Sequence, residues 1–398
     1  MGSLGQLYLD HAATTEVDTD VISAMTEMFS RQLGNPSSQH RAGRTAYQII
    51  EQAKMRLLRA VDANCEDMLA AMVIATSGGT EANNLAISGL RQSLASPIII
   101  SAIEHPSIAE TAKRLGNTNN CPARILPVDP NGLCRLDILH QWLSEYRCCN
   151  SNTPLVSIIL GNNEVGVVQE LENICELCHQ FGALVHADCC QVLGKISFSM
   201  RKLKLDALTI TAHKLHGPIG VGALIVRAGI AVNPIIFGGG QQLGIRPGTE
   251  ASVLLVGFAK AVELSMARLE QGVYGELALL RDYFEHRVLE SISGSIVLAK
   301  NARRLPHVSN VAFRGLDRQA LLMALDLAGI MCSTGSACAS GSNLPSPIVA
   351  AMNVPPEYAN GSMRFSFSHQ TTKNDVDWAV EKLAVIINKI RKPSCSAK

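Results

Sequence analysis

Chemically versatile side chains stand directly after several short apolar runs of the sequence. His105 follows "PIIIS", Asp188 follows "ALVHA", and Lys214 comes shortly after "ALTIT". Short apolar runs of this kind predict buried strands, and in an open α/β sheet ligands bind beyond the carboxyl ends of the strands. An imidazole, a carboxylate and an amine are therefore expected at one edge of a sheet.

The stretch "TSGGTEANN" follows another apolar run and precedes a predicted helix. Its small residues can present backbone N–H groups, and Thr80 its hydroxyl, to a phosphate. The glycine spacing differs from that of a dinucleotide fingerprint or a P-loop. A tight turn with a helix cap would give the same pattern, so both interpretations stay open for this stretch alone.

Two further strand ends carry amides, Asn163 after "LVSIIL" and Gln191 just beyond Asp188. Each feature has an ordinary explanation, because paired asparagines make turns, a lone histidine is usually structural, and an aspartate and a lysine form ion pairs. Together, however, five strand ends offer phosphate donors, a ring-stacking imidazole, a hydroxyl partner, an acid and an amine. Pyridoxal phosphate enzymes need this set, in which an acid keeps the pyridine nitrogen protonated and a lysine forms a Schiff base.

Cys338 lies in the stretch "CSTGSACASG", among glycine, serine and alanine. A structural cysteine usually packs among bulky apolar neighbours and is inert when buried. Small neighbours favour a bendable loop instead. The sequence therefore predicts an exposed, mobile thiol in a loop over about 332–345.

The elements that must position these residues are predicted by the apolar pattern. Seven short runs alternate with helical stretches, as in a mainly parallel sheet covered on both faces, and they begin at residues 71, 97, 124, 155, 183, 207 and 222. One helical stretch over 45–61 has an apolar stripe at helical period, made of Tyr47, Ile50, Ala53, Leu57, Leu58 and Val61.

At about residue 256 the pattern of apolar residues changes from short runs to long amphipathic segments, followed by mixed strands and helices. This pattern favours a smaller α+β domain. We expect a large α/β domain over 16–255. Residues 1–15 and 256–398 are expected to form the small domain, which carries the Cys338 loop.

Composition excludes several classes of function. A net charge of +1, from 35 basic and 34 acidic residues, gives no electrostatic footprint for nucleic acid. No apolar run is long enough to span a membrane, and the first ten residues lack the features of a signal peptide. Twelve cysteines without regular spacing fit free thiols in a reducing compartment. A cytoplasmic protein is therefore expected.

Ordered motifs along nearly the whole chain resemble the cysteine desulfurase and selenocysteine lyase group of the class V aminotransferase-like, fold type I pyridoxal phosphate enzymes. These motifs are "YLDHAATT" at 8, "GNPSS" at 34, "TSGGTEANN" at 76, "IEHPSI" at 103, "NNEVGVVQ" at 162, "HADCCQ" at 186, "AHKLHGP" at 212, "GGGQQLGIRPGTE" at 238, "GSACAS" at 335 and "RFSFS" at 364.

The resemblance implies a role for each matching position. Lys214 would be the Schiff-base lysine, and His105 would stack on the cofactor ring and assist proton transfer. The cofactor phosphate would be bound by Gly79, Thr80, Thr211 and His213. Asp188 would pair with the pyridine nitrogen, and Asn163 and Gln191 would contact the ring hydroxyl.

For the substrate, Arg364 would bind the carboxylate through its planar guanidinium, with Asn35 and Asn163 in the same pocket. Thr249 would reach the cofactor phosphate of the partner subunit, which implies a homodimer with shared active sites.

The chemistry implied by the resemblance converts L-cysteine into alanine, with Cys338 attacking the substrate sulfur and becoming a persulfide. The persulfide would then pass to a sulfur acceptor or a cluster-scaffold protein, for iron–sulfur clusters or thiolated cofactors. A selenocysteine lyase acting on L-selenocysteine is the alternative within the group. Further alternatives are a catalytically silent scaffold or thiol-relay protein, and an aminotransferase or decarboxylase on the same fold. Cys338 has no obvious role in an aminotransferase or a decarboxylase.

The remaining cysteines suggest no metal site. In "CELC" at 175–178 the two sulfurs share a helix face, but no second pair has the spacing that zinc needs. A transient iron–sulfur ligation by Cys338 and a regulatory disulfide between Cys332 and Cys338 stay open, with packing the simpler role for Cys332. Cys189 and Cys190 are expected to be small apolar fillers.

Overall fold

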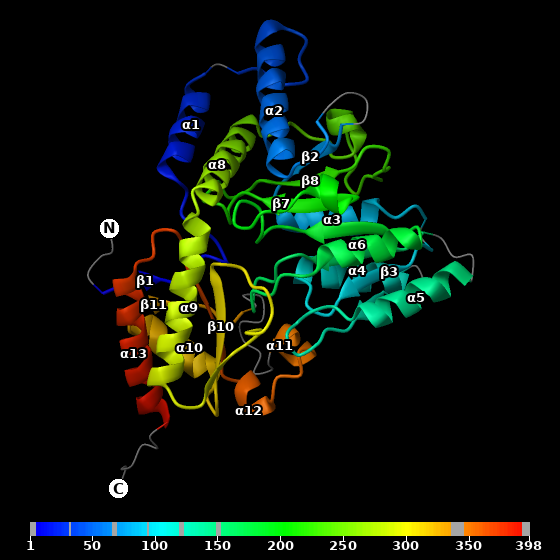
Figure 1. The fold of residues 1–398 in the computed structure, drawn as a ribbon. Coiled ribbons are helices and arrows are strands. Elements are labelled where there is room, and N and C mark those ends of the chain that lie inside the picture. The colour runs from blue at the N-terminus through cyan, green and yellow to red at the C-terminus, as the bar shows by residue number, and fades with distance from the viewer. Residues whose placement is uncertain are drawn as a thin grey trace.

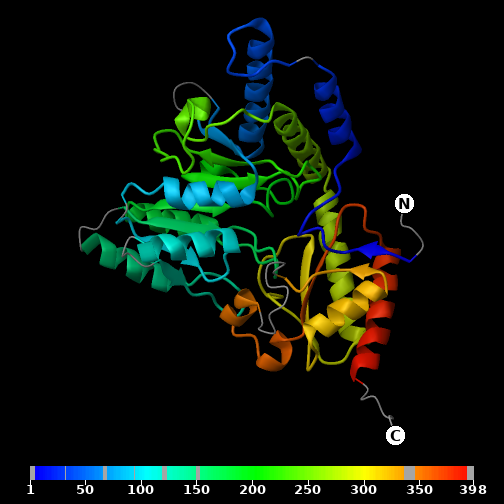
Figure 2. The same ribbon diagram turned by 180° about the vertical axis from the view of Figure 1, so that it is seen from behind.

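A computed structural model describes residues 5–31, 33–65, 70–93, 95–118, 123–148, 153–335 and 346–391 of the chain (Figures 1 and 2). Two groups of secondary structure are visible in both views, one built on a seven-stranded sheet and the other on smaller sheets. The Cys338 loop falls largely in 336–345, outside the described residues.

All seven predicted strands form, and they join in one sheet. In spatial order they are β2 Met72–Thr76, β8 Gly222–Val226, β7 Ala207–Thr211, β6 Leu184–Asp188, β5 Leu155–Ile159, β3 Ile98–Ser101 and β4 Arg124–Leu126. Neighbours from β7 to β4 run parallel, whereas β8 is antiparallel to both β2 and β7. The mainly parallel α/β sheet is thus confirmed.

Helices cover both faces of this sheet, as Figures 1 and 2 show from opposite sides. Alternate residues of β2, β3 and β8 enter two separate apolar clusters, so that Val73 and Ala75 of β2 face one layer and Ile74 faces the other. Burial on both faces explains why the strands read as continuous apolar runs. The helices of this group are α1 Thr19–Ser30, α2 Arg41–Ala60, α3 Gly79–Gly89, α4 Pro106–Thr118, α5 Leu136–Cys148, α6 Leu171–Gln180, α7 Met200–Leu203 and α8 Ser252–Glu270.

The apolar stripe predicted for 45–61 is present in α2, with one exception. Ile50, Ala53 and Leu57 are buried against the sheet layer, whereas Tyr47 is 52% exposed. Figure 1 shows that the amino-terminal half of α2 extends beyond the sheet, and Tyr47 lines a surface pocket there with Glu51. Helical period alone does not reveal where the covered surface ends, so the predicted stripe continues beyond the core at Tyr47.

The second group has its own apolar core. A three-stranded antiparallel sheet has the order β12-β10-β9, and a two-stranded parallel sheet pairs β1 with β11. The elements are β1 Leu7–Tyr8, β9 Ser295–Val297, β10 Val308–Phe313, β11 Ile330–Met331, β12 Ser362–Ser366, α9 Val273–Ser291, α10 Arg318–Leu327, α11 Pro347–Ala351, α12 Pro356–Ala359 and α13 Lys373–Arg391.

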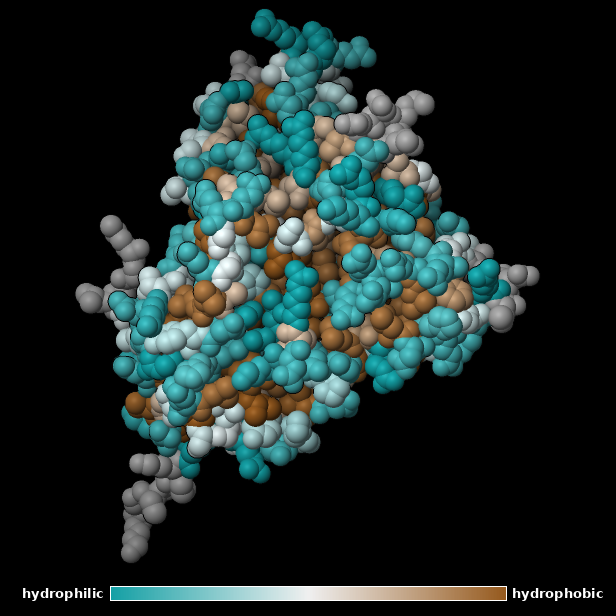
Figure 3. Space-filling model, viewed as in Figure 1, coloured by the Kyte–Doolittle hydropathy of each residue, from teal (hydrophilic) through white to brown (hydrophobic). Residues whose placement is uncertain are grey.

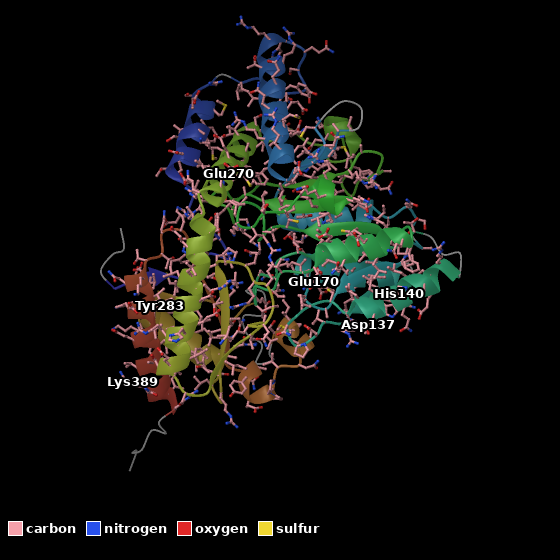
Figure 4. All side chains as sticks on the ribbon, in the orientation of Figure 1. Asp137, His140, Glu170, Glu270, Tyr283 and Lys389 are labelled. Carbon is pink, nitrogen blue, oxygen red and sulfur yellow. The ribbon has the colours of Figure 1, made fainter. Side chains whose placement is uncertain are left out.

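Aromatic rings of α9 and β12 fill the centre of this core, where Phe284 lies 4.9 Å from Phe365 between ring centroids. At its edge, Tyr283 projects from α9 toward α13 and donates a hydrogen bond of 2.7 Å to Asp377 (Figure 4). The predicted boundary at residue 256 falls within α8, whose Phe258 packs in the core of the large sheet. The division into two domains stays a prediction.

The surface seen in Figure 3 is largely hydrophilic, with hydrophobic side chains gathered mainly toward the middle of the view and along its lower part. Among the residues that the structure describes, no helix combines the length and apolar character needed to cross a membrane.

The fold makes a testable prediction at Gly222, where β8 passes close to the loop before α3. A Cβ on Gly222 would lie 2.6 Å from the carbonyl carbon of Gly78, closer than real Cβ atoms come. We expect Gly222→Ala to lower the free energy of unfolding by about 1–3 kcal/mol, because the extra methyl group overpacks this site. Urea unfolding measures the change.

Gly275 is the matched control, because it lies in helix α9 and a Cβ there would have no neighbour within 4 Å. Gly275→Ala should raise the free energy of unfolding by about 0.5–1 kcal/mol. Equal effects of the two substitutions would contradict the close approach at Gly222.

Candidate active site

A cavity of about 340 Å³ lies at the carboxyl ends of the parallel strands, where it also meets β12. Nine residues singled out from the sequence line it, namely Gly79, Thr80, His105, Asn163, Asp188, Thr211, His213, Lys214 and Arg364. They come from separate loops and elements of the chain, so the topology of the sheet brings them together.

One wall of the cavity is the start of helix α3. The first backbone N–H groups of an α-helix have no partner within the helix and attract anions. Gly79 begins this helix beside Cys190, and a Cβ on Gly79 would lie only 2.9 Å from the Cys190 sulfur. Thr80 is exposed at the same place. The backbone is thus open to an anionic group such as a phosphate.

Asp188 ends β6 in a buried position with defined donors. Its Oδ1 accepts a hydrogen bond of 2.9 Å from the backbone N–H of Cys190, and its Oδ2 accepts one of 2.8 Å from Asn83 Nδ2. Burial acts to raise the pKa of Asp188, but Lys214 and these donors outweigh it, and the pKa lies below its usual value. Asp188 is therefore a buried, ionised carboxylate facing the cavity.

His105 precedes α4 on another side of the cavity. Burial, and then the nearby Lys214, lower the pKa of His105, so the imidazole is neutral near pH 7. Its Nδ1 lies 2.7 Å from Ser107 Oγ and accepts a hydrogen bond of 3.1 Å from the Ser107 backbone N–H. Lys214 also lines the cavity, and no ion-pair partner of Lys214 is found among the described residues.

Arg364 reaches the cavity from β12 and is 2% exposed. Its Nη1 donates to the carbonyl oxygens of Asn163 and Gly335, at 2.9 and 3.2 Å. Its Nη2 donates to Asp10 Oδ1 at 2.6 Å, and its buried Nε has no partner among the described residues. The Nε–H is thus a donor without an acceptor among the described residues, and a guanidinium with a spare donor suits a carboxylate ligand.

Residues 7–378, most of the chain, match the aminotransferase class-V family. The chain belongs to this family. Membership implies pyridoxal phosphate as the general cofactor, and the donor set of the cavity fits that group. An anion site at α3, an ionised buried carboxylate and an amine surround one space, and the buried Oδ1 of Asn163 has no partner among the described residues.

Curated relatives in this family are cysteine desulfurases. The chain is 36% identical over 389 residues to cysteine desulfurase IscS of Dictyoglomus turgidum, covering 97% of this chain and 95% of that protein. It is 38% identical over 392 residues to a cysteine desulfurase of Cereibacter sphaeroides, with 97% of both chains covered. A solved NifS-like protein of Rickettsia africae has a TM-score of 0.86 at 32% identity, over 96% of this chain and 99% of that one.

Three predicted site residues do not line the cavity within this single chain. Asn35 and Thr249 are exposed on loops away from it. Gln191 is buried behind the wall, where its Nε2 donates to the carbonyl oxygen of Ala12 at 2.8 Å and its Oε1 lies 3.1 Å from His307 Nε2. The family roles of these residues stay predictions. Cys338, the predicted nucleophile, lies outside the described residues.

Sequence reasoning missed other residues that build the site. Asn83, Ser107 and Asp10 lie inside the quoted motifs "TSGGTEANN", "IEHPSI" and "YLDHAATT", so the motifs held a signal for them. No sequence signal pointed to His307, which lies 3.2 Å from the buried amine of Lys195. The described residues hold no group of three or more histidine, cysteine or acidic side chains arranged to bind a metal.

Lys195 gives a prediction about pH and stability. Burial, and then the charge of Lys214, lower the pKa of Lys195 to about 7, whereas an unfolded lysine has a pKa of about 10.4. Between these values the unfolded chain binds more protons, so this residue makes stability rise with pH. Relative to Lys195→Met, the wild type should gain about 1 kcal/mol in free energy of unfolding for each pH unit from 7 to 9.

Urea unfolding at pH 7, 8 and 9 measures this dependence. Lys202→Met, at an exposed lysine, is the control and should follow the wild type at each pH. An identical pH dependence in wild type and Lys195→Met would show that the Lys195 amine is not suppressed by burial.

Proposed function

We propose that the chain is a pyridoxal phosphate-dependent cysteine desulfurase, which converts L-cysteine into L-alanine and leaves the sulfur as a persulfide on Cys338. The observation that carries the proposal is the convergence of Lys214, Asp188 and Arg364 on one cavity, in a chain whose curated relatives are cysteine desulfurases. Selenocysteine lyase activity is the alternative within the same chemistry.

Each part of the cavity would hold one part of the cofactor. The start of α3 at Gly79 and Thr80, together with Thr211 and His213, would bind the phosphate. Asp188 would pair with the pyridine nitrogen, and His105 would stack on the ring. Asn163 would contact the ring hydroxyl. Lys214 would bond covalently to the aldehyde carbon.

When bound, the cofactor supplies an electron sink for bond cleavage next to the amino group of the substrate. Arg364 would bind the substrate carboxylate through its guanidinium, with Asn163 beside it. Lys214 Nζ would take the proton from Cα of the substrate.

The sulfur step needs a nucleophile, and Cys338 would supply it as a thiolate. A sulfur–sulfur bond forms as the bond between Cβ and sulfur breaks, and the electron pair of the broken bond stays with the amino-acid carbon. Protonation there gives the methyl group of alanine. The persulfide on Cys338 would pass to an acceptor or a cluster-scaffold protein.

We further propose a homodimer with shared active sites. Large apolar side chains in and near the loop that carries Thr249 are highly exposed, with Phe237 at 84%, Leu243 at 82% and Ile219 at 71%. Exposed apolar side chains gathered in one region favour a protein interface. A partner subunit bound there would bring Thr249 toward the neighbouring cofactor phosphate. We place the enzyme in the reducing cytoplasm, where the seven described free cysteines would stay thiols.

The cofactor bond to Lys214 is tested by absorbance and by reduction with borohydride. We expect purified protein reconstituted with pyridoxal phosphate to absorb at about 420 nm, because a cofactor joined to a lysine is a chromophore. Borohydride should then fix a pyridoxyl group on the peptide that contains Lys214, as detected by mass spectrometry.

Lys214→Ala should abolish both signals, whereas Lys202→Ala, at an exposed lysine, should keep them. A pyridoxyl group trapped on another peptide, or none in the wild type, would refute the assignment.

The Cys338→Ala variant distinguishes the two candidate substrates. We expect it to retain the absorbance of the cofactor and to lose alanine formation from L-cysteine by at least about a hundredfold, because no other group would attack the sulfur. Alanine is measured from L-cysteine and from L-selenocysteine, in each case with and without the substitution.

Cys332→Ala is the matched control, since Cys332 is a buried thiol whose pKa burial raises to about 12. It should keep its activity on L-cysteine. Turnover of L-selenocysteine alone, unchanged by Cys338→Ala, would favour the lyase instead.

A further inference from the structure

A chain of hydrogen bonds connects the two ionisable side chains on either side of the cavity, Asp188 and His105. Asn83 Nδ2 lies 2.8 Å from Asp188 Oδ2 and 2.8 Å from Ser107 Oγ. Ser107 Oγ in turn lies 2.7 Å from His105 Nδ1. All four residues line the cavity, and Asn83 and Ser107 are buried, at 1% and 8% exposure.

The direction of each hydrogen bond in this chain is fixed. An ionised carboxylate only accepts, so Asn83 must turn its amide nitrogen toward Asp188. The same nitrogen faces Ser107 Oγ with its second N–H, so this oxygen accepts from Asn83. The hydroxyl proton of Ser107 is then available to His105 Nδ1, which lies 2.7 Å from Oγ.

The backbone strengthens the same arrangement. The Ser107 backbone N–H donates to His105 Nδ1 at 3.1 Å. Because a backbone N–H can only donate, Nδ1 must be the acceptor. The His105 carbonyl oxygen accepts from Ile108 and Ala109 in the first turn of α4, which holds the histidine backbone in place. Two donors thus point at Nδ1, and the neutral imidazole carries its proton on Nε2.

We propose, on the basis of the cofactor site described above, that Asn83 and Ser107 are positioning residues that fix His105 as the Nε2–H tautomer under the control of Asp188. His105 then presents a hydrogen-bond donor, and no basic nitrogen, to the cofactor and substrate. The chain ends at an amide, which does not pass protons on. Lys214 is therefore the base at Cα, and His105 orients the reacting groups by donating a hydrogen bond.

The tautomer is measured directly by NMR on holoenzyme labelled with ¹⁵N in the imidazole rings. His105→Asn, which removes one of the eleven histidines, identifies the His105 signals. We expect the wild type to show a bare Nδ1 and a protonated Nε2. Ser107→Ala should add a minor Nδ1–H population, because only the backbone N–H of residue 107 then still donates to Nδ1.

The kinetic readout is alanine formation from L-cysteine. Ser107→Ala should lower kcat about tenfold with little change in KM, as expected for loss of a group that orients another. Ser107→Thr keeps a hydroxyl at the same position and should restore both the tautomer and most of kcat. Asn83→Ala should act in the same direction as Ser107→Ala.

Thr111→Val is the matched control on the same helix. Thr111 Oγ1 donates to the Ser107 carbonyl oxygen and to Asn84, but has no hydrogen bond to His105. It should leave the tautomer and kcat unchanged. A wild-type tautomer in Ser107→Ala, or an equal loss in Thr111→Val, would overturn the proposal.

The proposed function and this inference are tested by different measurements, so either can be refuted while the other stands. Absence of alanine formation by the wild-type holoenzyme would refute the desulfurase activity. The imidazole signals of wild type and Ser107→Ala would still decide whether Ser107 and Asn83 fix the His105 tautomer.

Discussion

The buried negative charge of Asp188 is the constraint on which the rest of the site depends. An isolated carboxylate at 4% exposure would be protonated, because burial disfavours its ionised form. Here Lys214 supplies the opposite charge, and donors from Cys190 and Asn83 satisfy both carboxylate oxygens. The strand end that carries Asp188 must therefore lie beside the loop that carries Lys214, which the parallel pairing of β6 with β7 ensures.

Arg364 links the second core of the protein to this charge. It lies on β12, far along the chain from Asp188, yet its guanidinium donates to the Asn163 carbonyl of the large sheet and to Asp10 of the amino-terminal segment. A buried guanidinium needs acceptors for its charge, and these acceptors hold its two Nη groups in place. Contacts from both cores thus hold this guanidinium at the wall of the cavity.

The positions of the strands could be predicted from the sequence, whereas most hydrogen bonds between side chains at their carboxyl ends could not. Seven apolar runs became seven strands, because burial on both faces leaves a continuous apolar pattern. The rule that ligands bind at the carboxyl ends then placed His105, Asp188 and Lys214 correctly around one cavity. The apolar pattern does not reveal the direction in which a strand runs, so the antiparallel orientation of β8 was not predicted. The bonds from Asn83 to Ser107 and from Lys195 to His307 join distant segments, and neither period nor composition encodes them.

Burial also explains why several of the described cysteines are poor nucleophiles. Burial raises the pKa of Cys175 to about 12, and that of Cys189 and Cys190 well above the usual value, with Asp188 adding to the effect at the last two. Because the thiolate is the nucleophile, these thiols are inert, and this includes Cys190, which lines the cavity. A reactive cysteine in this protein must therefore lie outside the packed cores, and small neighbours such as those of Cys338 meet that requirement.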